Sequence, residues 1–154
     1  MRENETFTFT TNENIKKEIK WLFDSDATNH MSWQEENFEE MKPYDSKMKV
    51  GDGRSLPVKG ICKIKMNIIC LNGSLIDLVV HDVLYVPDIS TNLISIGILN
   101  KKGFKILFED DKCIIHLSQE TVFECKQSTE YNNLFELIIN DEKHALNIKS
   151  TTNN

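Results

Sequence analysis

Residues 61–80 have the sequence ICKIKMNIICLNGSLIDLVV, and this stretch decides the fold class. Its first half alternates apolar side chains with polar ones at Lys63, Lys65 and Asn67, which is the pattern of a β-strand with one buried face. Asn72-Gly73 follows and favours a tight two-residue hairpin turn. Residues 75–80 then supply a second apolar run. The stretch therefore predicts an antiparallel β-hairpin.

Short apolar runs separated by turn residues continue on both sides of this hairpin, as expected for an antiparallel sheet. Upstream, Trp21–Phe23 predicts a strand that ends in a polar loop. Downstream, residues 91–103 (TNLISIGILNKKG) predict a strand end that leads into one short helix, which Gly103 can stop. We therefore expect an all-β domain with one short helix. Its other predicted strands are Met48–Val50, Leu56–Lys59, Val83–Val86, Phe104–Phe108, Cys113–Leu117, Val122–Cys125 and Leu134–Ile139.

The length and the charge of the chain limit its partners. A length of 154 residues suits a single domain. With 27% charged residues and a net charge of −6, the chain lacks the basic surface that a phosphate backbone requires, so we expect no direct nucleic-acid partner. The N-terminal residues contain no apolar signal region, and no run of about 18 apolar residues occurs. We therefore expect no membrane association and a cytoplasmic, intracellular location.

The spacing of cysteines and histidines argues against a metal site. The four cysteines form no CxxC pair, and the histidines are single and scattered. Three of the cysteines lie in or beside apolar runs, where a reduced thiol behaves as a small hydrophobic side chain. We therefore expect reduced thiols, no metal and no other cofactor. The residues concerned are Cys62, Cys70, Cys113 and Cys125, and His30, His81, His116 and His144.

The residues with the clearest chemical potential directly follow the strand Trp21–Phe23. Their sequence is Asp24-Ser25-Asp26-Ala27-Thr28. Two carboxylates that share one proton can activate a water molecule for peptide hydrolysis, because one acts as base while the other acts as acid. A chain of this size with one such aspartate has to pair with a second copy across a two-fold axis. Asp24 is the candidate, since the apolar strand lowers the dielectric constant at the loop base and Ser25 supplies a bracing hydroxyl.

This region, WLFDSDATNHM, resembles the catalytic motif of retropepsins from copia-type retrotransposons, in which an apolar strand precedes Asp-Ser-Gly-Ala-Ser/Thr and a nearby His-Met or His-Leu. The resemblance continues through VGDGRSLPVKG and HDVLYVPDISTNLISIGILNKKGFKILFED and ends near NNLFELIIN. It covers about residues 20–139, which leaves 1–19 as a lead-in and 140–154 as a disordered tail. It implies a single-domain, closed β-barrel of the retropepsin type. Such a domain is a homodimeric aspartic endopeptidase that processes a Gag-Pol polyprotein or another peptide substrate.

The resemblance also implies roles for single residues. Asp24 would be the catalytic aspartate and Ser25 the hydroxyl brace between the paired loops, with Ala27 and Thr28 shaping the loop behind them. The hairpin Gly51-Asp52-Gly53 resembles the flap that closes over a bound peptide, where glycines let the backbone approach a ligand closely. The segment NLISIGILNKKG resembles the strand-to-helix element that packs behind the catalytic loop, with Ser95 where retroviral relatives carry glycine.

Asp26 departs from the family pattern, because it stands where the catalytic triplet has glycine. Glycine lets the chain turn tightly and lets the substrate backbone lie close, so a side chain meets steric and conformational objections. A dimer would also gather four carboxylates around one site, and like charges a few Å apart resist joint ionisation. We therefore expect Asp26 to impair peptide cleavage.

Three alternatives stay open. A captured or decayed transposon fragment would keep the fold as a non-catalytic dimer or peptide-binding module. Residues 24–35 also match the outline of an EF-hand calcium loop, although its sixth position is Asn29 instead of glycine. The EF-hand ligands would be Asp24, Asp26, Thr28, His30, Ser32 and Glu35. In the third alternative, DSDATNH is simply a solvated turn of a small β domain.

Complete copia-type polyproteins resemble a series of zinc knuckle, protease, integrase and reverse transcriptase. The sequence contains neither the Cys/His spacing of a zinc knuckle nor a segment like the two later domains. We therefore expect the chain to be a piece of such a polyprotein.

Overall fold

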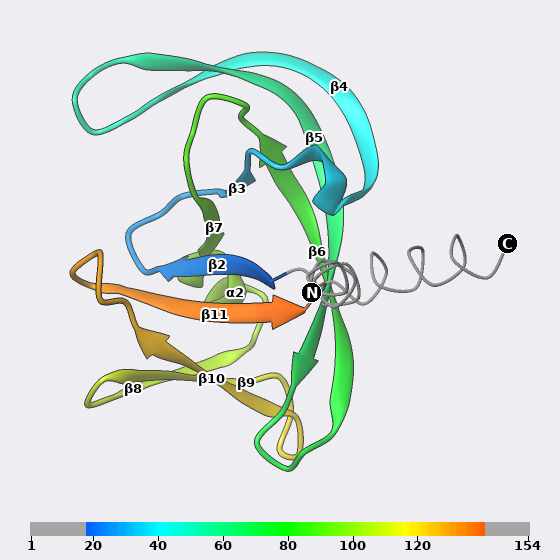
Figure 1. Cartoon of the computed structure of the whole chain (residues 1–154), viewed down its shortest axis with the longest axis vertical. Coiled ribbons are helices and arrows are strands. Elements are labelled where there is room, and N and C mark those ends of the chain that lie inside the picture. The colour runs from blue at the N-terminus through cyan, green and yellow to red at the C-terminus, as the bar shows by residue number, and fades with distance from the viewer. Residues whose placement is uncertain (1–17, 141–154) are drawn as a thin grey trace, which may run out of the picture.

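The computed structural model describes residues 18–140, which form one ten-stranded sheet with one short α-helix and one 3-10 turn (Figure 1). The predicted lead-in, residues 1–19, and the predicted tail, residues 140–154, lie outside the described residues except for 18–19, which belong to β2, and 140, which ends β11. The prediction of an all-β domain with one short helix is thus confirmed for the part described. The elements are β2 (Glu18–Asp24), β3 (His30–Ser32), η1 (Glu35–Asn37), β4 (Phe38–Lys49), β5 (Ser55–Ile69), β6 (Leu75–Tyr85), β7 (Asn92–Ser95), α2 (Ile96–Lys101), β8 (Lys105–Glu109), β9 (Lys112–His116), β10 (Val122–Gln127) and β11 (Leu134–Asn140).

The strands follow the order β4-β5-β6-β3-β7-β2-β11-β10-β9-β8. Within residues 18–140, β4 and β8 each pair with one neighbour, so the sheet has two free edges and a closed barrel is not confirmed. The sheet nevertheless curls strongly. The far end of the β5–β6 hairpin reaches the β9–β10 end of the sheet in Figure 1, and the Leu71 N–H donates to the carbonyl of Val122 at 2.8 Å.

The core lies inside this curl. Polar Lys63, Lys65 and Asn67 lie on the opposite face of β5 from a row of buried residues, so the predicted alternation is confirmed. Trp21 and Phe23 of β2 face the same core and are 1% and 0% exposed. The four cysteines are free and buried, as expected. The buried row of β5 contains Val58, Gly60, Cys62, Ile64, Met66 and Ile68.

The hairpin turns differ from the prediction in one detail. The Cys70 N–H donates to the Ser74 carbonyl at 2.8 Å and the Gly73 N–H donates to the Cys70 carbonyl at 2.9 Å, so residues 71–73 form a three-residue loop. The prediction of a two-residue turn is wrong, because Gly73 takes a φ of 89° as the left-handed residue that completes this longer loop.

β5 and β6 each join two segments that were predicted as separate strands, and two further strands, β4 and β3, differ more from the prediction. β4 begins at Phe38, ten residues before the predicted start at Met48, and β3 was not predicted. β4 is an edge strand that is exposed along most of its length and contains Pro43, so it has no alternating apolar pattern. It packs closely on β5, because a Cβ at Gly60 would lie 2.8 Å from the Met41 side chain. No helix within residues 18–140 is long and apolar enough to cross a membrane.

Candidate functional site

Asp24 is the last residue of β2, where the strand leaves the middle of the sheet. Its backbone pairs with Leu134 of β11 on one side and with Ser95 of β7 on the other. The preceding apolar residues lie in the core, while Asp24 itself is half-buried at the mouth of the loop. Its Oδ1 accepts the backbone N–H of Asp26 at 2.8 Å, which closes a tight turn of the Asx type. The predicted strand that ends in a polar loop is therefore confirmed.

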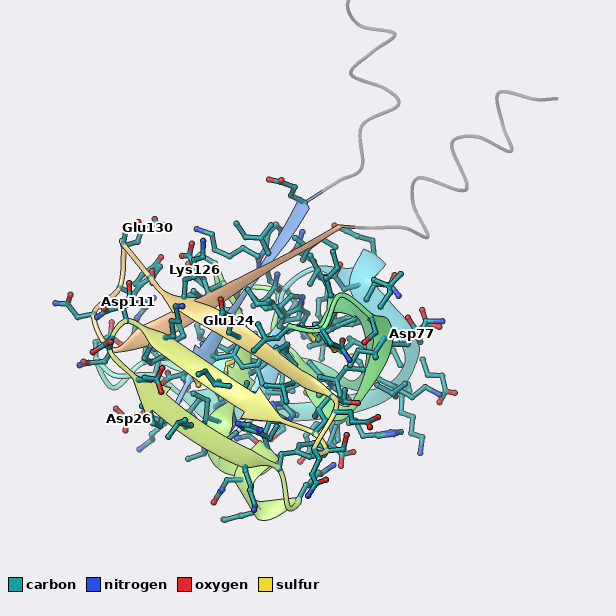
Figure 2. All side chains as sticks on the ribbon, turned by 90° about the horizontal axis from the view of Figure 1, so that it is seen from below. Asp26, Asp77, Asp111, Glu124, Lys126 and Glu130 are labelled. Atoms are coloured by element: carbon teal, nitrogen blue, oxygen red, sulfur yellow. The ribbon has the colours of Figure 1, made fainter. Side chains whose placement is uncertain are left out.

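The loop after Asp24 presents its side chains to solvent. Ser25, Asp26 and Thr28 are exposed, and Ala27 is half-buried. Figure 2 shows Asp26 at the periphery of the molecule. Asp26 is also not among the residues with positive φ, so its backbone is one that any residue adopts. The conformational objection to an aspartate at this position is therefore wrong for the single chain, whereas the objections from the close approach of the substrate backbone and from clustered carboxylates stay predictions.

Ser95 anchors the loop through both its backbone and its side chain. Its backbone N–H donates to His30 Nδ1 at 2.9 Å, and its hydroxyl donates to the carbonyl of Ala27 at 2.6 Å. The same hydroxyl accepts the Ile98 N–H at 3.2 Å and so caps the N-terminus of α2. Ser95 is 1% exposed. The segment from β7 into α2 thus holds the middle and the far end of the Asp24 loop.

His30, at the start of β3, is buried and neutral. It is 1% exposed, and its Nδ1 is an acceptor, so the ring proton of the neutral form lies on Nε2. Burial lowers the pKa of His30 from its ordinary 6.5 to about 4; the positive charge of Lys102 adds to this effect and Asp82 opposes it. A charged imidazole could not accept the Ser95 N–H. The anchor therefore depends on the neutral form.

A second buried hydrogen-bond network joins the other ends of β3 and β7. The Ser32 hydroxyl donates to Asn92 Oδ1 at 2.6 Å. Asn92 Nδ2 donates to Gln34 Oε1 at 2.6 Å and to the carbonyl of Lys20 at 3.2 Å. Ser32 and Asn92 are 0% and 4% exposed. This network joins β2, β3 and β7, so both ends of the short strand β3 are fixed by hydrogen bonds to β7.

Sequence reasoning named Ser95, but it named His30 and Ser32 only as ligands of the EF-hand alternative and missed their role in the anchor, and it missed Asn92 altogether. The available signal was a polar residue directly next to an apolar one at a strand position, in HMS and in NLIS. Such residues are buried only when their hydrogen bonds are satisfied. Their partners lie about sixty residues away in the chain, so the sequence alone could not pair them.

The predicted flap residues form the turn of the β4–β5 hairpin. Gly53 has a φ of 87°, and its N–H donates to the Val50 carbonyl at 2.9 Å. Asp52 Oδ2 lies 2.7 Å from Arg54 Nε, and both side chains are exposed. In Figure 1 this hairpin projects beyond the body of the sheet. Within residues 18–140 no hydrogen bond joins it to the Asp24 loop. The predicted tight turn is confirmed, and its role as a flap remains a prediction.

The structure contradicts the EF-hand alternative. An EF-hand places its loop between two helices, whereas residues 24–35 run from the end of β2 through β3 to a single 3-10 turn. Two of its supposed ligands, His30 and Ser32, are buried, and their side chains are already hydrogen-bonded to Ser95 and Asn92. Among residues 18–140 no three acidic, histidine or cysteine side chains are placed to hold a metal ion.

Residues 21–104 match a family model described as Pol polyprotein, beta-barrel domain. This range is more than half of the chain and includes the Asp24 loop, β3, β7 and α2. A search of curated proteins returned no match, and a search of solved structures returned none. The residues that match the family model begin in β2 and end just before β8.

Proposed function

Because the chain belongs to the family of Pol polyprotein beta-barrel domains, we propose that it is a retropepsin-type domain of a copia-type Gag-Pol polyprotein. In this proposal Asp24 is the catalytic aspartate of an aspartic endopeptidase. The observation that carries it is the double anchor of the Asp24 loop by Ser95, through Ala27 and His30. A reacting carboxylate has to be held to within a fraction of an ångström, and this anchor fixes the loop from a rigid strand-to-helix element.

The chemistry requires two chains. One carboxylate cannot act as base and acid in the same step, so two copies of Asp24 meet across a two-fold axis and share one proton. The ionised copy takes a proton from water as the water attacks the peptide carbonyl, and the protonated copy donates to the carbonyl oxygen. Ser25 is exposed beside Asp24, where it can brace the partner loop. The Gly51-Asp52-Gly53 hairpin would close over the bound peptide as the flap.

Asp26 would reduce the activity of this dimer. Its carboxylate is two residues from Asp24, and its backbone N–H already binds Asp24 Oδ1. Two further negative charges near the dyad favour protonated carboxyls and disturb the one-proton state. Since Asp26 does not have a positive φ, we attribute the impairment to its charge and to the space that its side chain takes from the substrate backbone.

A second candidate function keeps the fold without the chemistry. Asp26 favours it, because a captured transposon fragment under no demand for proteolysis can hold a charged residue in the catalytic triplet. Such a domain would act as a dimer or a peptide-binding module, with the same anchored loop serving only the fold.

Cleavage of a mixed peptide library, read by mass spectrometry at acidic and at neutral pH, separates the two functions. The natural chain is compared with Asp26→Gly and with Asp26→Asn, which keeps the side-chain size and removes the charge. We expect both variants to cleave faster than the natural chain, by on the order of tenfold or more. If neither variant cleaves any peptide while both remain folded, the non-catalytic function replaces the proposal.

A further inference from the structure

The two free edges of the sheet differ in how well they are protected against pairing with another chain. β4 carries Pro43, irregular register and exposed charged side chains, which are the devices that block edge-to-edge association. β8 has no proline and pairs with β9 in a regular register, and its charged side chains, Lys105 and Glu109, stand only at its two ends. Its sequence is KILFE, and its two central large side chains, Leu107 and Phe108, are 47% and 51% exposed. Figure 2 shows β8, β9 and β10 side by side, with Asp111 at the turn that joins β8 to β9.

The hydrogen bonds of β9 determine which groups of β8 face outward. Gln127 N–H donates to the Asp111 carbonyl and Leu117 N–H to the Thr121 carbonyl, so the odd-numbered residues of β9 bond to β10. Even-numbered residues of β9 therefore bond to β8, opposite Lys105, Leu107 and Glu109. The backbone N–H and C=O groups of Ile106 and Phe108 are left at the free edge. Among residues 18–140, no strand pairs with that edge.

We propose that this edge binds the same edge of a second copy of the chain, as an antiparallel β8–β8 pair about a two-fold axis at Leu107. In this register Ile106 faces Phe108 of the second copy, and these are the residues whose backbone groups are free. The pairing is isologous, so each contact occurs twice. It does not rest on the proposed function, because it uses no residue of the Asp24 loop.

The side chains of β8 are complementary to themselves in this register. Lys105 faces Glu109 of the second copy at both ends, and Leu107 faces Leu107 at the centre. These three residues share one face of β8, since side chains alternate along a strand. Of these three residues Leu107 lines a groove of about 800 Å³, whose apolar lining also includes Leu71, Ile114 and Val122, and a second Leu107 would enter it. On the other face Phe108 lies 5.5 Å from the ring of Phe135, which extends the apolar contact.

A pair of five-residue strands buries less area than a stable interface of roughly 1,600 Å², so the dimer should be weak. The charge pattern gives a test that does not depend on absolute affinity. In Lys105→Glu, residues 105 and 109 are both acidic, and in Glu109→Lys both are basic. Each variant repels itself at both ends of the strand pair, whereas a mixture of the two restores both attractive pairs. The double variant, with both substitutions, is self-complementary again.

Sedimentation velocity at high protein concentration measures these associations on the full chain, with circular dichroism as the control for folding. We expect each single variant to self-associate on the order of tenfold more weakly than the natural chain, and the equal mixture and the double variant to recover. Hydrogen exchange should slow at the amides of Ile106 and Phe108 as concentration rises. If the mixture associates no better than its components, or if these two amides show no concentration dependence, the β8 interface is wrong. These two amides lie outside the proposed Asp24-loop dimer, so their exchange distinguishes a failure of the β8 interface from a failure of the proposed function.

Discussion

Replacement of Ser95 by alanine tests whether this residue anchors the Asp24 loop. The change removes one hydroxyl from a side chain that is 1% exposed and leaves the backbone N–H bond to His30 in place. It removes the bond to the Ala27 carbonyl and the cap on the Ile98 N–H, at 2.6 and 3.2 Å. The perturbation is therefore confined to two contacts whose partners are known.

The expected loss of stability follows from these two contacts. Removal of a serine N-cap costs about 1 kcal/mol. Loss of a partly buried hydrogen bond costs about another 1 kcal/mol, because the Ala27 carbonyl loses its partner. The free energy of unfolding should fall by about 2 kcal/mol in total, which leaves a domain of ordinary stability folded.

Urea unfolding followed by tryptophan fluorescence measures this loss, since Trp21 lies in the core beside the site. With a slope of about 2 kcal/mol per molar, the midpoint should fall by about 1 M while the slope stays the same. Ser90→Ala is the matched control, because Ser90 is exposed five residues earlier in the chain. If Ser95→Ala shifts the midpoint no more than Ser90→Ala, the loop is not anchored in this way.

Two further predictions concern protons and thiols. The pKa of His30 is lower in the folded chain than in the unfolded chain, so as the pH falls the unfolded chain is protonated first. The contribution of neutral His30 to the free energy of unfolding is therefore fully present above about pH 6.5, and it falls by about 3 kcal/mol as the pH drops to about 4. Urea midpoints across this range measure the fall, and His30→Asn should flatten it; an equal fall in that variant would contradict the assignment. Burial raises the pKa of Cys62 and of Cys113 to about 11, and all four cysteines are buried. A thiol reagent at pH 8 should therefore label the native chain slowly and label four thiols per chain in urea, and rapid labelling of the native chain would contradict the fold.

Local patterns predicted those parts of the fold whose signal lies within a few residues. The alternation around Lys63 and Lys65 predicted which face of β5 is exposed. Gly103 predicted the end of α2, and this glycine takes a φ of 100° just after the helix. The first ten residues of β4 were missed, because a strand exposed on both faces has no apolar period. β3 was missed because two of its three residues are polar, although His30 and Ser32 are buried.

The candidate site was predicted only in part, for a related reason. The Asp24 loop and Ser95 could be found by their motifs, since each motif is a continuous segment. The hydrogen bonds that join them connect residues more than sixty positions apart, and no local pattern encodes such a pair. The pairing of strands distant in sequence is hidden in the same way, so the sequence could not show that the sheet formed by residues 18–140 keeps two free edges. The conformational objection to Asp26 failed because the loop turns without a positive φ there.

A subunit-mixing experiment tests most directly the claim that Asp24 works as one half of a dyad shared by two chains. The active chain is the natural chain, or Asp26→Gly if that variant cleaves faster. It is held at a fixed concentration, and a folded Asp24→Asn chain is added in ninefold excess. If the site needs Asp24 from both subunits, random pairing leaves about one tenth of the active chains in active dimers, and cleavage falls about tenfold. Unchanged cleavage at that excess, or full activity of Asp24→Asn alone, would contradict the account.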